Sequence, residues 1–367
     1  MPGITFVQGG FSSVGGIENF AGELLRALRG RQIPVGLICW NAGNAQLALE
    51  ALLSAGISVH CSEWRWGCRW GWPDKVMARR EWKRLVEADL LVFGKLLHED
   101  IHRGLARLGK RMILITPYRP AEMWAGRRAD DLLLNSFEAI VVQASSFEGD
   151  LRVIGYRGHI VTLPYLPPEV SEPAPWPQAG PLQIGFLGRL VPDKNVKYLL
   201  AAFSRLGTMG TEACLHLYGD GPERDAMQSL TAQLGLTELV RFHGSMRRDE
   251  IASAIDRCHI FAFSSSTEGQ CLAALEILAR GRPVVGTPVG AFPEFLESPL
   301  GCVAPLGNAD AYAVALRVTG SWTREGKVNP ANIQQAYMRR FNRERVMDEY
   351  IGLFGCYESH REEAQIA

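Results

Sequence analysis

The sequence lacks several features that would each assign a protein to a well-defined class. Its 39 basic and 39 acidic side chains cancel over 367 residues, so global charge gives no reason to expect a nucleic-acid partner. Its eight cysteines include no Cys-x-x-Cys pair. We therefore expect buried free thiols in a reducing compartment, and neither a metal-ligand cluster nor a disulfide framework.

Long apolar runs are missing as well. No run reaches the ~18 apolar residues that would span a bilayer. The first residues, MPGITFV, show no basic segment followed by a long apolar stretch, so we expect no signal peptide. These absences predict a cytoplasmic protein, which would meet a membrane only through its surface, as a peripheral protein at the inner face.

The features that are present point to two α/β domains. A chain of 367 residues is long enough for about two domains. Short apolar runs alternate with segments of helical period, which favours parallel sheets built from βα units. The strands predicted in the first half are Ile4–Val7, Pro34–Cys39, Leu90–Phe93, Met112–Ile115 and Ala139–Val142. Those predicted in the second half are Leu182–Leu187, Cys214–Tyr218, Val240–Phe242, His259–Phe263, Pro283–Val285 and Cys302–Ala304. Four prolines fall between residues 171 and 181. Because proline disfavours both helices and central strands, we expect the interdomain linker there.

The most informative segment is Thr267–Glu276, TEGQCLAALE. Glu268 and Glu276 stand eight positions apart and bracket a glycine turn and an apolar helical turn, so we expect Glu268 in a loop and Glu276 inside a helix. The N–H groups of the first helical turn would then open toward whatever Glu268 contacts. This geometry suits an anion beside a polyhydroxylated group, and a nucleotide sugar offers both.

The segment resembles the Glu-x7-Glu signature of family 4 retaining glycosyltransferases. Two further elements resemble motifs of the same family: Ile184–Leu190 followed by Lys194, and the turn Leu217–Glu223. Three ordered motifs over about residues 182–304 are far more specific than a lone Gly-x-Gly. The resemblance implies the GT-B fold, an α/β architecture of two facing Rossmann-like domains with a deep interdomain cleft.

The resemblance also implies a domain plan and an activity. We expect an acceptor-side domain over 1–170, a linker over 171–181, a nucleotide-sugar-binding domain over 182–342, and a C-terminal helix over 343–367 that crosses back to the first domain. The implied reaction moves a sugar from a UDP- or GDP-linked donor to a glycan or lipid-linked acceptor, with retention of the anomeric configuration. No cofactor is implied, and the absence of an Asp-x-Asp after a strand fits a metal-independent transferase.

Roles for individual residues follow from the same resemblance. Arg189 and Lys194 would neutralise the charge that builds on the leaving diphosphate. Glu268 would accept hydroxyls of the donor sugar, and Glu276 those of the ribose. The rest of the predicted donor site consists of Gly188, Gly219, Gly221, Gly269, Gln270, Cys271 and Leu272. Gln270 and Cys271 depart from the commoner Phe-Gly pair of the family, which leaves the identity of the sugar open.

A glycine-rich loop follows the first strand, at Gly9–Glu18. It is not Gly-x-Gly-x-x-Gly, which argues against a dinucleotide-binding dehydrogenase. It resembles the loop with which the family approaches the donor diphosphate or the acceptor. Gly15 and Gly16 would permit close backbone approach there.

Members of the family commonly carry a histidine near the transferred sugar, just after the strand predicted at Met112–Ile115. Here Tyr118 stands at that place. The sugar contact could come from Tyr118 or Arg119, or from His98 in the preceding loop, or activity could be weak or lost. The rival hypothesis is therefore a non-catalytic protein of the same fold that binds a nucleotide sugar or a glycan.

One further segment, Trp64–Arg84, is unusual in composition. It holds five of the nine tryptophans and seven basic residues, against only Asp74 and Glu81 as acidic ones. Tryptophan together with arginine and lysine suits an anionic membrane surface. The same residues would also suit stacking on sugar rings, or an ordinary packed aromatic cluster with solvated flanks.

Overall fold

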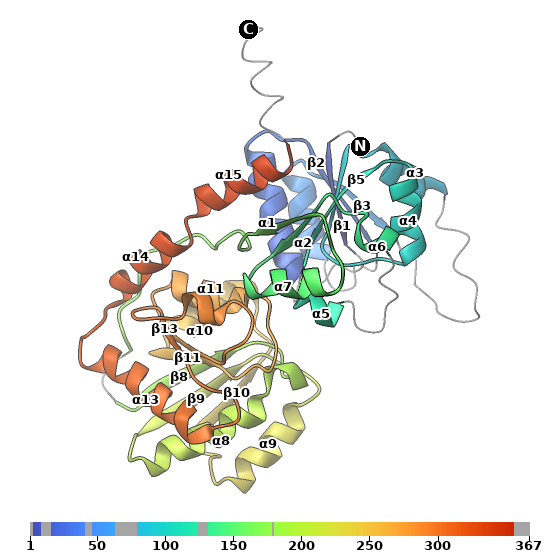
Figure 1. The fold of residues 1–367 in the computed structure, drawn as a ribbon. Coiled ribbons are helices and arrows are strands. Elements are labelled where there is room, and N and C mark those ends of the chain that lie inside the picture. Colours follow the sequence, from blue (N-terminus) through green and yellow to red (C-terminus); the bar gives the residue numbers. More distant parts are fainter. Residues whose placement is uncertain are drawn as a thin grey trace. The chain divides into compact units, whose positions relative to one another are not determined.

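The computed structural model describes residues 3–8, 16–40, 46–62, 79–116, 118–123, 131–177 and 180–355. The chain divides into two compact units (Figure 1). The first unit comprises Met1–Leu166 together with Glu344–Ala367, and the second comprises Pro167–Arg343. Each unit is built around its own parallel sheet.

The sheet of the first unit has seven strands in the order β3-β2-β1-β4-β5-β6-β7. They are β1 (Ile4–Gln8), β2 (Val35–Trp40), β3 (Ser58–Ser62), β4 (Leu90–Phe93), β5 (Arg111–Ile115), β6 (Ala139–Val142) and β7 (His159–Thr162). All neighbouring strands pair in parallel. This is the Rossmann order, in which the direction of strand addition reverses between β1 and β4.

Eight helices accompany this sheet in the described part of the unit. They are α1 (Gly16–Gly30), α2 (Gln46–Ser54), α3 (Arg79–Glu87), α4 (Glu99–Arg107), α5 (Pro120–Met123), α6 (Asp131–Leu134), α7 (Ser146–Val153) and α15 (Arg343–Leu353). The C-terminal helix α15 packs on this unit. The ring of Tyr350 lies 5.8 Å from that of Phe20, and its hydroxyl donates to the carbonyl of Pro164 over 3.1 Å.

The second unit repeats this plan with six parallel strands in the order β10-β9-β8-β11-β12-β13. They are β8 (Leu182–Leu187), β9 (Ala213–Tyr218), β10 (Val240–Gly244), β11 (Ile260–Phe263), β12 (Val284–Gly286) and β13 (Gly301–Val303). The order again reverses once, between β8 and β11. Both units are therefore Rossmann-like, and the predicted two-domain α/β fold is confirmed.

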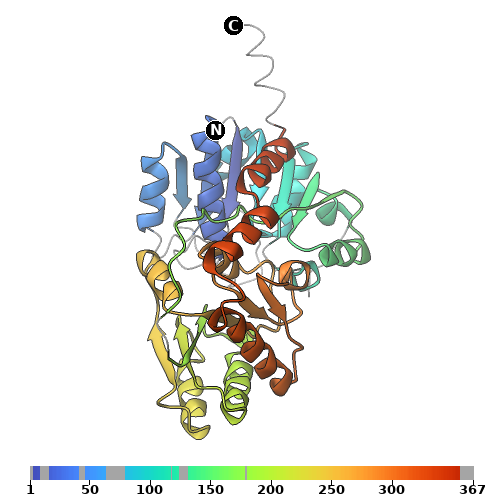
Figure 2. The same ribbon diagram turned by 90° about the vertical axis from the view of Figure 1, so that its left-hand side faces the viewer.

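The helices of the second unit are η1 (Pro192–Lys194), α8 (Val196–Thr208), α9 (Arg224–Gln233), α10 (Arg248–Asp256), α11 (Leu272–Ala279), α12 (Phe292–Phe295), α13 (Ala309–Arg324) and α14 (Pro330–Arg340). Helices α8 and α13 pack against each other (Figure 2). Leu199 and Leu316 from these helices join Leu215 of β9 in one buried core. Helix α11 instead packs against α14.

Strand prediction from the sequence succeeded in the interior of both sheets and failed at the edges of the first. All six strands of the second unit were predicted to within two residues, whereas β3 and β7 were missed. These two strands lie at the two edges of their sheet. An edge strand needs fewer apolar residues, and β3, with the sequence SVHCS, has no apolar run that would mark it.

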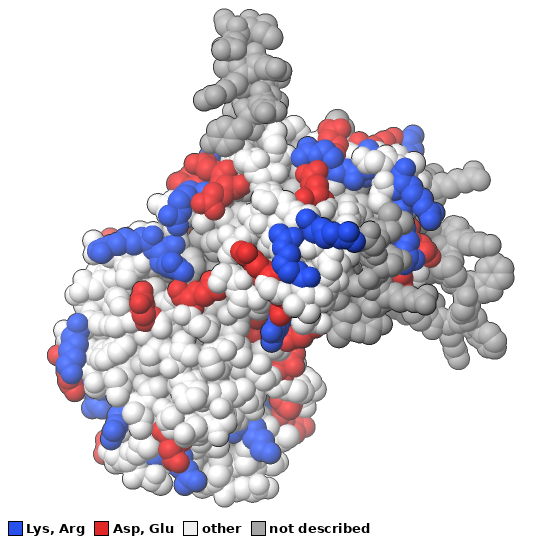
Figure 3. All heavy atoms as spheres, in the orientation of Figure 1, with Lys and Arg blue, Asp and Glu red and all other residues white. Residues whose placement is uncertain are grey.

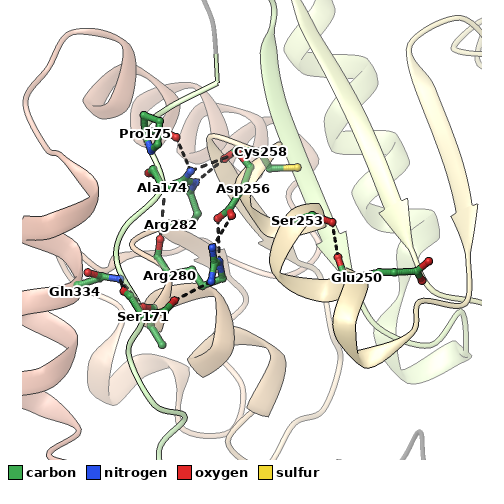
Figure 4. A network of polar contacts seen from close by, with 11 residues as sticks. Ser171, Ala174, Pro175, Glu250, Ser253, Asp256, Cys258, Arg280, Arg282 and Gln334 are labelled. Atoms are coloured by element: carbon green, nitrogen blue, oxygen red, sulfur yellow. Dashed lines mark hydrogen bonds and ion pairs between the residues drawn. The ribbon is translucent and has the colours of Figure 1, made fainter.

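The proline-rich stretch predicted as the linker has no helix or strand over its described residues, 171–177. It belongs to the second unit and is hydrogen-bonded to side chains from other parts of that unit (Figure 4). Arg280 donates to the Ser171 hydroxyl over 2.8 Å, and Gln334 donates to the Ser171 carbonyl over 2.9 Å. Arg282 donates to the carbonyls of Ala174 and Pro175.

Charge is distributed without a dominant sign on the face that Figure 3 shows, where basic and acidic side chains are interspersed. This agrees with the equal numbers of basic and acidic residues in the chain. Among the residues that the structure describes, no helix combines the length and the apolar character needed to cross a membrane.

Candidate active site

The candidate site of the second unit lies where the order of its sheet reverses. Strands β8 and β11 are neighbours, but the chain leaves their carboxyl ends toward opposite sides of the sheet. Ligands of open α/β sheets bind at such a reversal, outside the carboxyl ends of the strands. The loop after β8 carries Arg189 and Lys194, and the loop after β11 carries Glu268. The fold thus brings together residues that are 74 positions apart in sequence.

Hydrogen bonds join these two loops directly. The hydroxyl of Ser264 donates to the carbonyl oxygens of Lys194 and Asn195 over 2.9 and 3.0 Å. The backbone N–H of Ser266 donates to the carbonyl of Asp193 over 2.8 Å. These bonds hold the lysine-bearing loop against the glutamate-bearing loop, so the relative position of the two charges is set by backbone contacts.

Lys194 and Glu268 form an ion pair at the centre of the site. The Lys194 ammonium lies 2.6 Å from the Glu268 carboxylate, and the two side chains are 22% and 7% exposed. The hydroxyl of Ser265 donates to the same carboxylate oxygen over 2.7 Å. A buried carboxylate is stable only with such partners. Because an ammonium has three N–H donors and Glu268 accepts from one, Lys194 can bind a second anion from this position.

The electrostatics of the site keep Lys194 charged. Burial has the largest single effect and lowers the pKa of the Lys194 ammonium, but overall this pKa is raised above its ordinary value, chiefly by the charge and the hydrogen bond of the Glu268 carboxylate. The positive charge of the Arg189 guanidinium acts in the opposite direction and lowers the pKa of Lys194 slightly. Arg189 itself is exposed. Lys194 and Glu268 thus form the charged centre of the site.

Helix α11 begins directly beside this centre. Glu268 lies in the loop before it and Glu276 lies within it, as predicted. A backbone hydrogen bond holds this loop in place, because the carbonyl of Gly269 accepts from the N–H of Ala291 over 2.9 Å. In the first turn, which starts at Leu272, the N–H of Ala274 donates to the carbonyl of Cys271 over 3.0 Å, whereas the N–H groups of Leu272 and Ala273 come too early in the helix to have an intrahelical acceptor. They supply donors and a positive dipole end for an anion.

Cys271 is the residue that leads into α11, and its backbone is left-handed, with φ 60° and ψ 81°. A residue with a side chain pays on the order of 1–2 kcal/mol for this conformation. The commoner glycine of the family would adopt it without strain. Burial raises the pKa of the Cys271 thiol well above its ordinary range, so the thiol is neutral at physiological pH.

The turn after β9 requires both of its predicted glycines. Gly219 has φ +133°, and a Cβ there would overlap the carbonyl oxygen of Gly188. A Cβ at Gly221 would overlap the carbonyl of Leu190. The N–H of Gly188 in turn donates to the carbonyl of Tyr218 over 2.9 Å. These glycines let the turn after β9 pack directly against the loop that carries Arg189.

Glu276 has the partner that its position in an apolar helix required. A nitrogen of the Arg248 guanidinium lies 3.2 Å from a Glu276 carboxylate oxygen. The neighbours Leu275 and Ile277 are fully buried, whereas the side chain of Glu276 remains 23% exposed. The carboxylate is therefore accessible at the surface of the unit.

The structure adds residues to the site that the sequence analysis missed. Ser264 joins the two loops, Ser265 donates to the Glu268 carboxylate, and Arg248 pairs with Glu276. The run of three serines that directly follows β11 could have indicated the first two, since hydroxyls at the carboxyl end of a strand face the ligand side of the sheet. No local signal distinguishes Arg248 from the other arginines of the chain.

In the first unit, the residues predicted to contact the sugar or the acceptor have no contact with one another among those described below. Gly16 is the first residue of α1, and Gly15 lies outside the described residues. Tyr118 is exposed. Arg119 forms a two-point ion pair with Asp150 of α7, with contacts of 2.6 and 3.1 Å. His98 precedes α4, and its ring accepts from the N–H of Asp100 over 3.4 Å, so it caps that helix.

The tryptophan-rich segment Trp64–Arg84 lies outside the described residues up to position 78. Within its remainder, the ring of Trp82 packs so closely on α4 that a Cβ at Gly104 would overlap it. The guanidinium of Arg84 lies 3.1 Å from the ring nitrogen of His60. Trp82 therefore belongs to the packing of the unit, as in the third of the alternatives stated for this segment.

The second unit is similar in sequence to known proteins. Residues 181–319 match the family described as group 1 glycosyl transferases. The chain is 29% identical over 180 residues to 2-deoxystreptamine glucosyltransferase of Streptomyces kanamyceticus, which covers 46% of this chain and 45% of the relative. It is 30% identical over 170 residues to the lipopolysaccharide core biosynthesis glycosyltransferase LpsE of Rhizobium meliloti, covering 46% and 48%. The chain thus spans about half the length of the curated relatives it matches.

Solved structures extend the likeness to nearly the whole chain. The Anabaena protein HepE in complex with UDP-glucose superposes with a TM-score of 0.75 at 14% identity, over 96% of this chain and 100% of the other. Sucrose-phosphate synthase from Thermosynechococcus elongatus superposes with a TM-score of 0.74 at 17% identity, over 98% and 100%. The resemblance to glycosyltransferases with the GT-B fold is confirmed, while the narrower assignment to retaining family 4 stays a prediction.

Proposed function

We propose that the protein is a retaining glycosyltransferase that moves a sugar from a UDP- or GDP-linked donor to a glycan or lipid-linked acceptor without a metal ion. The observation that carries this proposal is the Lys194–Glu268 ion pair at the reversal point of the second sheet, beside the first turn of α11. The printed names of the relatives support sugar transfer. The complex of HepE with UDP-glucose supports a nucleotide-sugar donor.

Each part of the site has a task in this reaction. The bond between the anomeric carbon and the diphosphate breaks, and negative charge develops on the leaving phosphate. Lys194, Arg189 and the first-turn N–H groups of α11 are placed to neutralise that charge, which is where preorganised electrostatics lower a barrier most. Glu268 orients the sugar by accepting its hydroxyls, and Glu276 accepts those of the ribose.

The second candidate is a non-catalytic protein of the same fold that binds a nucleotide sugar or a glycan. It is favoured by the residues that follow β5, where Tyr118 stands in place of the family's histidine and Arg119 is paired with Asp150. Release of nucleotide from a panel of UDP- and GDP-sugars, measured with and without glycan acceptors, distinguishes the two. Transfer is expected to release nucleotide, binding without release would favour the second candidate, and no binding at all would contradict both.

The two glutamates are predicted to act on different parts of the donor. Glu276→Ala should weaken binding of the free nucleoside diphosphate by about 1.5–3 kcal/mol, the usual size for hydrogen bonds to a charged group. Glu268→Ala should mainly weaken binding of the intact nucleotide sugar, because its contacts are to the sugar. Isothermal titration of both variants with nucleotide and with nucleotide sugar tests this division, and equal losses in all four titrations would contradict it.

Contact with an anionic membrane through Trp64–Arg84 remains part of the proposal, at the cytoplasmic face. The segment has a local excess of five positive charges, from seven basic and two acidic residues, and each cation near an anionic surface contributes roughly 1 kcal/mol. The protein is expected to sediment with anionic vesicles at low salt and to be released as salt screens the attraction.

Replacement of Arg79, Arg80 and Lys83 with glutamine should abolish this sedimentation and leave nucleotide binding intact. Arg84 is retained in this variant because it contacts His60. A matched variant loses the same charge elsewhere, through substitution of the exposed residues Arg205, Lys327 and Arg339, and should still sediment. If the wild-type protein stays in solution at low salt, the segment does not bind membranes.

A further inference from the structure

The ion pair between Arg248 and Glu276 joins the start of one helix of the second unit to the middle of another. Arg248 is the first residue of α10, and Glu276 lies within α11, 28 positions later. The Arg248 side chain is 58% exposed and that of Glu276 is 23% exposed. Exposed ion pairs of this kind contribute little to folding stability, because solvent screens them and two long side chains must be ordered. Stability alone therefore gives little reason for the pair.

The position of Arg248 on its helix is also unfavourable in itself. A cation in the first turn opposes the positive end of the helix dipole. The turn is otherwise acidic, with Asp249 and Glu250, and Glu250 accepts from the backbone N–H of Arg247 over 2.8 Å. This cap holds the start of α10 in place, and with it the base of the Arg248 side chain. An arginine that occupies such a position and contacts a specific carboxylate points to a role in the site.

A carboxylate that accepts two adjacent hydroxyls must be both ionised and correctly oriented. A glutamate side chain has several rotatable bonds, and ordering it only when the ligand arrives would weaken binding. The planar guanidinium of arginine orients a carboxylate better than a flexible ammonium does. Because a guanidinium nitrogen of Arg248 contacts one carboxylate oxygen of Glu276 over 3.2 Å, the carboxylate is oriented before a ligand binds.

We propose that Arg248 is a positioning residue, which holds the Glu276 carboxylate in the orientation that accepts the ribose hydroxyls of the nucleotide. The inference rests on the proposed function, since it deepens the role of Glu276 in the same site. It predicts that Arg248 strengthens nucleotide binding only when both the carboxylate of Glu276 and the hydroxyls of the ribose are present.

The test measures binding of UDP and GDP, and of their 2′,3′-dideoxy forms, by titration calorimetry. Arg248→Ala should weaken binding of the nucleotide that the wild-type protein prefers on the order of 10-fold, a size within the range of couplings between contacting residues. The loss should disappear for the dideoxy form and in a Glu276→Ala background. Arg248→Lys should restore part of the affinity, and the melting temperature should stay near that of the wild type.

Arg247→Ala is the matched control. Arg247 immediately precedes α10 and pairs with Asp249 over 2.7 Å, so its removal deletes a neighbouring arginine without touching Glu276. The nucleotide affinity of the Arg247→Ala variant should equal that of the wild-type protein. An Arg248→Ala variant that binds nucleotide normally would overturn the inference. So would a loss that persists with the dideoxy form or in the Glu276→Ala background, because Arg248 would then contact the nucleotide directly. A wild-type protein that binds neither nucleotide would instead contradict the proposed function itself.

Discussion

Replacing Lys194 with alanine is expected to lower turnover of the preferred nucleotide sugar about 100- to 1000-fold, the usual cost of removing one preorganised electrostatic group. Lys194 is held charged beside Glu268, and in the proposed reaction it neutralises the charge that develops on the leaving phosphate. The effect should appear in kcat, because the interaction strengthens as the bond breaks. Nucleotide release under saturating donor measures it directly.

Folding must be separated from catalysis in this experiment. Lys194→Ala leaves the Glu268 carboxylate with Ser265 as its hydrogen-bond donor, so some stability will be lost along with the ion pair. The melting temperature and the circular dichroism of the variant report that loss. Lys197→Ala is the matched control, since Lys197 lies three positions later and is exposed; it should retain full turnover. Unchanged turnover in a folded Lys194→Ala protein would remove Lys194 from the catalytic site.

The largest loss of stability is expected at Arg282. Its side chain is completely buried, and it donates to the carbonyls of Cys258, Ala174 and Pro175 over 2.9, 3.1 and 2.8 Å. Its guanidinium also lies 4.8 Å from the ring of Trp176. Figure 4 shows how these bonds attach the proline-rich stretch to the end of α11. Burial lowers the pKa of Arg282 to about 10, which still leaves it charged at neutral pH.

Arg282→Met should therefore destabilise the protein by about 3 kcal/mol, since hydrogen bonds from a charged group contribute more than ordinary ones. The melting temperature should fall by about 6–12 °C, and the amides of residues 171–177 should exchange hydrogen faster. Arg339→Met, at an exposed position of α14, is the control and should change stability by less than about 0.5 kcal/mol. Wild-type stability together with wild-type exchange would show that the arginine does not hold this stretch.

The local parts of the fold and the site could be predicted from the sequence. Alternation of apolar runs and helical periods located the strands of the second unit, because strands buried on both faces must be apolar along their whole length. The spacing of Glu268 and Glu276 placed one in a loop and the other in a helix, because Gly269 and the apolar run that follows determine where the helix begins. The glycines at 219 and 221 were predicted to form a tight turn, and the structure shows why no larger residue fits there.

Contacts between distant segments needed the tertiary structure. Three contacts depend on how helices and loops pack after the sheet has formed. They are the hydrogen bond from Ser265 to Glu268, the ion pair of Arg248 with Glu276, and the hydrogen bond from Arg282 to a residue 107 positions away. Hydrophobic period and turn chemistry act over a few residues, so they specify elements and their order along the chain. Which side chain meets which carboxylate depends on packing between elements. The sequence by itself thus determined the elements and the types of residue in the site, and the tertiary structure decided their partners.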